Sequence, residues 1–137
     1  MKIIFLAGKK NVGKTTTMRM LFNILTKNKK VNTTKIPGTS AKDFHCIFKY
    51  KNKNVAIFSA GDVLRLIFLG IFIYSQADYL IMPFNVGGKQ KAEIISYFKK
   101  YNSTRLIIKT VCQKGASKII KDKANLKDCN AIIKEIK

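Results

Sequence analysis

The fold of this chain follows from residues 2–25, which read KIIFLAGKKNVGKTTTMRMLFNIL. Residues 2–7 are apolar and rich in strand-forming side chains, which predicts a buried parallel strand. From Lys14 onward, apolar residues return at the spacing of one helix face. That face comprises Met18, Leu21, Phe22 and Leu25. The chain therefore begins with a strand, a glycine-bounded loop and an amphipathic helix.

The rest of the chain alternates expected strands and helices. Strands are expected within 31–36 and at 44–50, 54–58, 79–82 and 105–110. Helices are expected at 63–74, at 89–101 and toward the C-terminus, with a break near Asn125. Because only three residues separate 44–50 from 54–58, these strands should form an antiparallel hairpin over 44–58. The pattern predicts an α/β fold with a mostly parallel sheet, in one domain over 1–137.

Residues 63–74 are almost continuously apolar and are expected to form a buried helix. The segment is too short to span a bilayer, which takes about 20 residues. No transmembrane segment is therefore expected. The alternatives are a helix that faces a partner, including a second copy in a homodimer, and a helix that lies at a membrane surface.

The formal net charge of +20 on 137 residues makes this a strongly basic protein. Most of the positive charge is lysine, and the abundance of Lys, Ile and Asn is typical of an A+T-rich genome. A lysine-coated surface is the simpler interpretation, and a polyanion partner such as nucleic acid is the alternative. The chain has no Trp and only three arginines, which weakens the nucleic-acid interpretation.

The cysteines Cys46, Cys112 and Cys129 show neither disulfide-framework nor zinc spacing. Reduced thiols indicate a cytoplasmic location. The short apolar run at 3–7, followed by Gly8 and two lysines, does not have the form of a signal peptide.

The loop after the first strand matches G-x-x-x-x-G-K-[ST], a pattern that cradles phosphates when it joins a strand to a helix. Its residues are Gly8, Lys9, Lys10, Asn11, Val12, Gly13, Lys14 and Thr15, and Thr16 follows. Glycines let the backbone curl around an anion, and the helix N-terminus offers free N–H groups. Lys14 should reach the β- and γ-phosphates, and the Thr15 hydroxyl should bind Mg²⁺.

This segment resembles the Walker A loop of P-loop NTPases. The resemblance implies the three-layer sandwich of that superfamily, a nucleoside triphosphate ligand (ATP or GTP) and a magnesium ion. It makes the loop residues and Thr16 the expected nucleotide-binding residues, with Lys14 acting in catalysis.

The carboxylate that should accompany such a loop is less clear from the sequence. Small Ras-like GTPases resemble the region around 44–61, but the aspartate of their D-x-A-G turn is replaced here by Phe58. Residues 59–62, Ser-Ala-Gly-Asp, also resemble an S-x-G-D segment of small uncharacterised bacterial P-loop proteins. Asp62 is thus the first candidate for catalysis and metal binding, with Ser59 beside it, and Asp43 is a second metal candidate. Asp62 could instead cap the following helix.

Further polar residues are weaker candidates. Thr39 and Ser40 lie where Ras-like proteins place a mobile switch threonine. Residues 85–90 follow a strand that should end near the phosphates, so they could form a lid with Lys89. Arg65 could stabilise transferred phosphate. A plain surface role is the alternative for each.

Three functions remain open. The first is a Mg²⁺-dependent NTPase, a hydrolase expected to use ATP in preference to GTP because the guanine-reading N-K-x-D signature is missing from 109–114. The second is a nucleotide or small-molecule kinase, although such enzymes usually gather several arginines on a lid. The third is a non-enzymatic nucleotide-dependent switch that binds nucleic acid or another polyanion.

Overall fold

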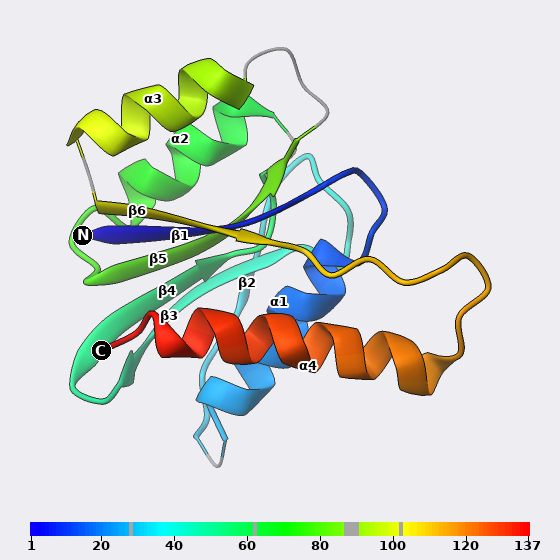
Figure 1. Cartoon of the computed structure of the whole chain (residues 1–137). Coiled ribbons are helices and arrows are strands. Elements are labelled where there is room, and N and C mark those ends of the chain that lie inside the picture. Colours follow the sequence, from blue (N-terminus) through cyan, green and yellow to red (C-terminus); the bar gives the residue numbers. More distant parts are fainter. Residues whose placement is uncertain (28, 62, 87–90, 102) are drawn as a thin grey trace.

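The computed structural model describes residues 1–137 except 28, 62, 87–90 and 102. Within this part of the chain, six strands form one sheet and four helices cover it (Figure 1). The elements are β1 (Lys2–Gly8), α1 (Lys14–Leu25), β2 (Thr34–Lys35), β3 (Phe44–Tyr50), β4 (Lys53–Phe58), α2 (Leu64–Ile73), β5 (Tyr79–Asn85), α3 (Lys91–Tyr101), β6 (Ser103–Ile108) and α4 (Lys118–Lys134).

The strand order is β2-β3-β4-β5-β1-β6. β1 pairs in parallel with β5 and β6, and β4 pairs in parallel with β5. β3 is antiparallel to β4 and to β2, so the hairpin predicted over 44–58 is confirmed. Because β3 runs against the parallel strands, its first residues lie at the edge of the sheet where β1, β4 and β5 end.

The helices form a layer on each face of the sheet, α1 and α4 on one and α2 and α3 on the other (Figure 1). β1 explains why both faces are covered, since successive side chains of a strand point to opposite faces. Ile3 and Phe5 pack in the core under α2 and α3, whereas Ile4 and Leu6 pack in the core under α1 and α4. The predicted α/β, three-layer arrangement with a mostly parallel sheet is confirmed.

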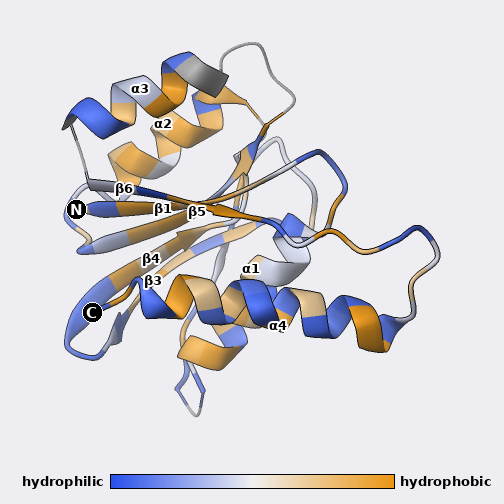
Figure 2. Cartoon of the chain, viewed as in Figure 1, coloured by the Kyte–Doolittle hydropathy of each residue, from blue (hydrophilic) through white to orange (hydrophobic). Residues whose placement is uncertain are grey.

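The expectation that residues 63–74 form a buried helix is half wrong. α2 is helical, but Val63, Phe68, Leu69, Phe72 and Ile73 are exposed, and Phe72 keeps 81% of its accessible surface. The physical reason is that a helix in an outer layer contacts the sheet with one face only. Figure 2 shows α2 as a mainly hydrophobic ribbon in that outer layer. In the described part of the chain, no helix is both long and apolar enough to cross a bilayer.

Two further differences from the expected elements matter for the site. β6 covers 103–108 instead of 105–110, which leaves Lys109 and Thr110 in the following loop. α4 continues through Asn125 without a break, because Asn125 is buried and its Oδ1 accepts a hydrogen bond from the Thr17 hydroxyl, 3.0 Å away.

Cys46 and Cys129 are buried, and burial raises the pKa of each thiol to about 11.

Candidate functional site

The loop from Gly8 to Thr15 joins the carboxyl end of β1 to the amino end of α1. Asn11 and Gly13 have positive φ angles of 62° and 92°. Gly13 is the N-cap of α1 and supplies no side-chain cap, and the first helical turn carries no acidic residue. Unoccupied helix N–H groups and the positive end of the helix dipole favour an anion at this position.

Lys14 brings a positive charge to the same place. Its side chain is buried, and Nζ donates hydrogen bonds to the carbonyl oxygens of Gly8, at 3.0 Å, and Lys9. The ammonium group is therefore held against the loop backbone. Around it, exposed positions ring the loop at Lys9, Lys10, Asn11 and Thr16.

A carboxylate and two hydroxyl groups meet beside the start of α1. Thr15 Oγ1 donates to Asp43 Oδ1 at 3.3 Å, and Ser59 Oγ donates to the same oxygen at 3.2 Å. The backbone N–H of Phe44 donates to Ser59 Oγ at 2.8 Å, which holds the Ser59 hydroxyl in place. Asp43 reaches this position because it directly precedes β3, at the edge where the parallel strands end.

This oxygen cluster has the chemistry that Mg²⁺ prefers. The Thr15 hydroxyl donates its hydrogen bond to Asp43, so the lone pairs of its oxygen remain available to a cation. Among the described residues no group of three or more His, Cys, Asp or Glu side chains could hold a metal. That does not count against Mg²⁺, which usually takes one or two carboxylates and completes its shell with water and phosphate oxygens.

The other carboxylate candidate, Asp62, lies outside the described residues. β4 ends in Phe58 and not in a carboxylate. The Phe58 ring is fully buried in the core under α2, stacks on His45 at 5.7 Å between centroids and fills the space beside Gly70. Because side chains alternate along a strand, Phe58 points to α2, and the next residue, Ser59, points to Asp43 and the loop.

The weaker candidates lie elsewhere or make local contacts. The Thr39 hydroxyl donates to the Ile36 carbonyl at 2.8 Å, and the Ser40 hydroxyl accepts from the Lys42 N–H at 3.3 Å. Asn85 ends β5 opposite Gly8, and the rest of the expected lid, residues 87–90 with Lys89, lies outside the described residues.

None of the arginines is placed as a phosphate ligand. Arg19 lies over the Phe44 ring, 3.9 Å from its centroid, and Arg105 pairs with Glu135 at 3.2 Å. Arg65 is exposed on α2. This arrangement gives no support to an arginine lid of the kinase type.

A cavity of about 550 Å³ opens on the other side of the loop. It lies between the loop, the segment that follows β6 and the start of α4. Its lining residues are Asn11, Val12, Gly13, Thr16, Lys109, Thr110, Val111, Cys112, Gln113, Lys114, Gly115, Lys118, Lys121, Asp122 and Asn125. Its volume is within the usual range for small-molecule sites.

A buried ion pair fixes the wall of this cavity. Lys109 Nζ lies 2.8 Å from Asp128 Oδ2, and both side chains are almost fully buried. Asp128 also accepts from the Thr110 N–H at 3.0 Å and from the Thr110 hydroxyl at 2.6 Å. The segment after β6 is therefore tied to α4 directly beside the phosphate loop, where the aliphatic part of Lys109 packs against Gly8.

Sequence reasoning missed this second half of the site. Lys109, Thr110, Asn125 and Asp128 belong to no recognisable motif. A usable signal was nevertheless present, since Lys109 directly follows an apolar strand and ligands bind at the carboxyl ends of parallel strands.

The fold and the loop thus define an α/β protein in which a loop suited to an anion follows the carboxyl end of β1. No protein-family model and no curated protein sequence matches the chain. Among solved structures, the G domain of the T. maritima FeoB iron transporter aligns with 93% of this chain and 98% of that chain, at 15% identity and a TM-score of 0.29. Similarity at that level does not establish a shared fold or function.

Proposed function

We propose that this chain is a P-loop protein that binds a nucleoside triphosphate, with its phosphates on the loop from Gly8 to Thr15. The observation that carries the proposal is the amino end of α1. It has no side-chain cap, no acidic residue in its first turn and the buried ammonium of Lys14 folded over the loop. The charge and the N–H groups gathered there suit a polyphosphate.

We propose that Thr15 and Asp43 hold the accompanying Mg²⁺. The hydrogen bond from Thr15 to Asp43 orients the hydroxyl oxygen, and Ser59 fixes the carboxylate from its other side. When bound, the ion neutralises phosphate charge between the β- and γ-positions. We thus propose Asp43 as the carboxylate ligand of Mg²⁺, the role for which the sequence pattern favoured Asp62.

The nucleoside would occupy the cavity of about 550 Å³ beside the loop. Gly13, Thr16 and Lys109 line it beside the loop, and residues 110–115 form the rest of that wall. Without the guanine-reading signature, ATP is the first ligand to test and GTP is the comparison.

We propose hydrolysis as a slow Mg²⁺-dependent activity of the same site. The Ser59 hydroxyl already accepts a hydrogen bond from the Phe44 N–H and donates one to Asp43. It therefore positions the carboxylate and is poorly placed to activate water. The described arginines make their contacts elsewhere, so little in this part of the chain stabilises the charge that develops during phosphoryl transfer.

A thermal-shift series tests the proposal. ATP and GTP are added with and without Mg²⁺ to the wild-type chain, to Lys14→Ala and to Lys27→Ala, an exposed-lysine control that changes the charge equally. Stabilisation of about 2.7 kcal/mol is expected at a hundredfold excess over Kd. The full stabilisation should require Mg²⁺. At the same ATP concentration it should fall to about 0.4–1.4 kcal/mol in Lys14→Ala and stay unchanged in Lys27→Ala. Equal shifts in both variants would show charge-driven binding to the lysine surface instead.

A further inference from the structure

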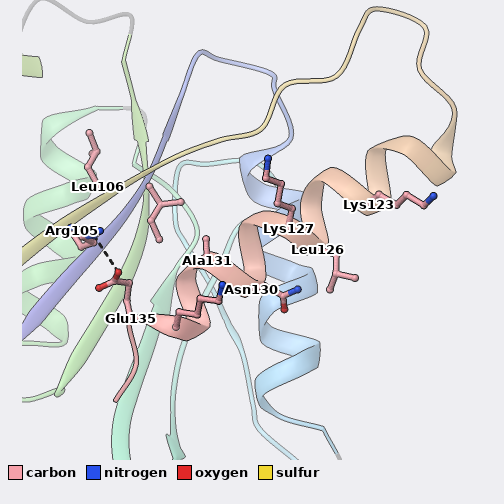
Figure 3. Close-up of a pocket in the computed structure, with 10 residues that line it drawn as sticks. Arg105, Leu106, Lys123, Leu126, Lys127, Asn130, Ala131 and Glu135 are labelled. Carbon is pink, nitrogen blue, oxygen red and sulfur yellow. Dashed lines mark ion pairs between the residues drawn. The ribbon is translucent and has the colours of Figure 1, made fainter.

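A groove runs along the open edge of the sheet, between β6 and α4. β6 is the last strand of the order, and among the described strands it pairs with β1 alone. α4 lies beneath this edge, and a cavity of about 680 Å³ separates the two elements (Figure 3). The groove is distinct from the proposed nucleotide cavity, which lies at the carboxyl end of the strand.

The backbone of β6 presents hydrogen-bonding groups to this groove. The Lys109 N–H donates to the Ala7 carbonyl at 2.7 Å, so Lys109 faces β1. In a parallel pair, alternate residues bond to the same neighbour, so residues 105 and 107 also face β1. Leu106 and Ile108 therefore turn their N–H and C=O groups to the open edge. Ile108 is 65% exposed, which leaves the end of that edge accessible.

Most of the charged side chains around the groove are cationic. Arg105 comes from β6, and Lys123, Lys127 and Lys134 come from α4. Among the described residues that line the groove, Glu135 alone is acidic, and it already pairs with Lys2 and Arg105. Between the cations lie the apolar side chains of Ile107, Leu126 and Ala131. Figure 3 shows Lys127 projecting upward from the middle of α4, and Lys123 projecting from the amino-terminal part of α4, farther from β6.

We propose that this groove binds an extended acidic segment of a partner protein, which adds to β6 as a further strand. An exposed edge is a template for strand addition, in which backbone bonds give affinity and side-chain contacts give specificity. Alternating acidic and apolar side chains would match the lysines and the apolar floor. A second copy of this chain fits poorly, because its own β6 edge would bring the same cations to the groove.

Nucleic acid is the competing polyanion. Its recognition as a single strand relies on aromatic stacking, and no aromatic side chain is found among the described residues that line this groove. Phosphate oxygens can accept from the outward N–H groups of Leu106 and Ile108, but they cannot donate to the outward C=O groups, which a peptide strand would pair as well. The open edge and the charge together therefore favour a peptide.

The binding test uses a fluorescent peptide of alternating Glu and Val and a single-stranded oligonucleotide of equal charge. Ile108→Pro removes an outward N–H without removing a bond to β1, and Ile108→Ala is its matched control. Peptide affinity should fall at least tenfold in Ile108→Pro and stay within about twofold in Ile108→Ala. Lys123→Glu with Lys127→Glu should weaken the peptide far more than Lys27→Glu with Lys53→Glu, which changes the net charge equally.

A direct reading comes from amide hydrogen exchange of the unmodified chain. The peptide should protect the amides of Leu106 and Ile108, and protection of the amides of 105 and 107 should change little. Absence of peptide binding, equal loss in the two charge-reversal pairs, or no protection of Leu106 and Ile108 would overturn the proposal. Tighter binding of the oligonucleotide, unaffected by Ile108→Pro, would assign the groove to nucleic acid.

Discussion

Two buried aspartates stand on either side of the phosphate loop, and their partners differ. Asp128 pairs with the buried ammonium of Lys109 and accepts two further bonds from Thr110. Asp43 accepts bonds from two hydroxyl groups, those of Thr15 and Ser59. A carboxylate neutralised by a buried lysine fixes structure, whereas one oriented by hydroxyls at a helix N-terminus is suited to a cation. Asp128 thus stabilises the wall of the site, whereas we propose that Asp43 binds its metal.

The largest expected effect is on stability, and it should separate the two aspartates. Asp128→Asn leaves the Lys109 charge buried without its counter-ion, which should cost about 3–5 kcal/mol of unfolding free energy. Asp43→Asn should cost about 1 kcal/mol or less, because an amide oxygen can still accept from both hydroxyls. Urea denaturation measures both, with the exposed Asp122→Asn as control. Equal losses for Asp43 and Asp128 would remove the distinction between them.

The next effect concerns the loop itself. Lys14→Ala should weaken ATP binding by roughly 10- to 100-fold, the range expected for loss of a charge-assisted hydrogen bond to phosphate. Isothermal titration calorimetry in 150 mM salt measures it, since exposed lysines are screened there. Lys27→Ala should bind ATP as the wild type does. Unchanged affinity in Lys14→Ala would place the phosphates somewhere other than this loop.

A smaller effect is expected on the Mg²⁺ dependence of ATP binding, which should differ between the variants of Asp43 and Asp128. In the wild-type chain, Mg²⁺ should tighten ATP binding. In Asp43→Asn, the increase in ATP affinity that Mg²⁺ produces should be about tenfold smaller, because the ion loses its carboxylate ligand. Asp128→Asn, studied at a temperature where it remains folded, should keep the gain. If Mg²⁺ tightened ATP binding in Asp43→Asn as much as in the wild type, Asp62 would again be the first candidate for the carboxylate ligand.

The smallest effect is a pH slope from His45, two residues after Asp43. Burial lowers the pKa of His45 below its usual value. The unfolded chain therefore takes up this proton near pH 6.5, whereas the folded chain takes it up only at lower pH. Stability should fall as the pH drops through this window and should level off once the folded histidine is protonated. His45→Gln should remove the slope, while Asp43→Asn should retain it; urea titrations between pH 7.5 and 5.5 compare the three.

The sequence predicted the parts of this molecule that depend on local patterns. The apolar run of β1, the helical face of α1 and the hairpin over 44–58 all follow from side-chain periodicity and short connections. The phosphate loop could be recognised because its glycines and lysine stand at fixed spacing. Asp43 could be named as a candidate but not preferred, because its contact with Thr15 depends on which way β3 runs.

Contacts between distant segments could not be predicted in this way. The pair of Lys109 and Asp128 depends on how α4 packs under β6, and no spacing in the sequence records that packing. The exposure of α2 depends on there being no further layer over it, whereas its apolar sequence alone indicated burial. The position of Phe58 could not be predicted either. Side chains alternate along β4, but the sequence does not say which of the two faces of the sheet α2 covers.

The central claim, that phosphates bind at the loop from Gly8 to Thr15, is tested most directly by an amide chemical-shift titration with Mg²⁺ and ATP. On a chain with a net charge of +20, site-specific mapping is needed to distinguish this loop from general attraction to lysines. The largest saturable shifts should fall on the amides of Gly13, Lys14 and Thr15, and Lys14→Ala should raise the ATP concentration at their midpoint by roughly 10- to 100-fold. Shifts spread over the lysines of α4, with the loop amides unmoved, would contradict the claim.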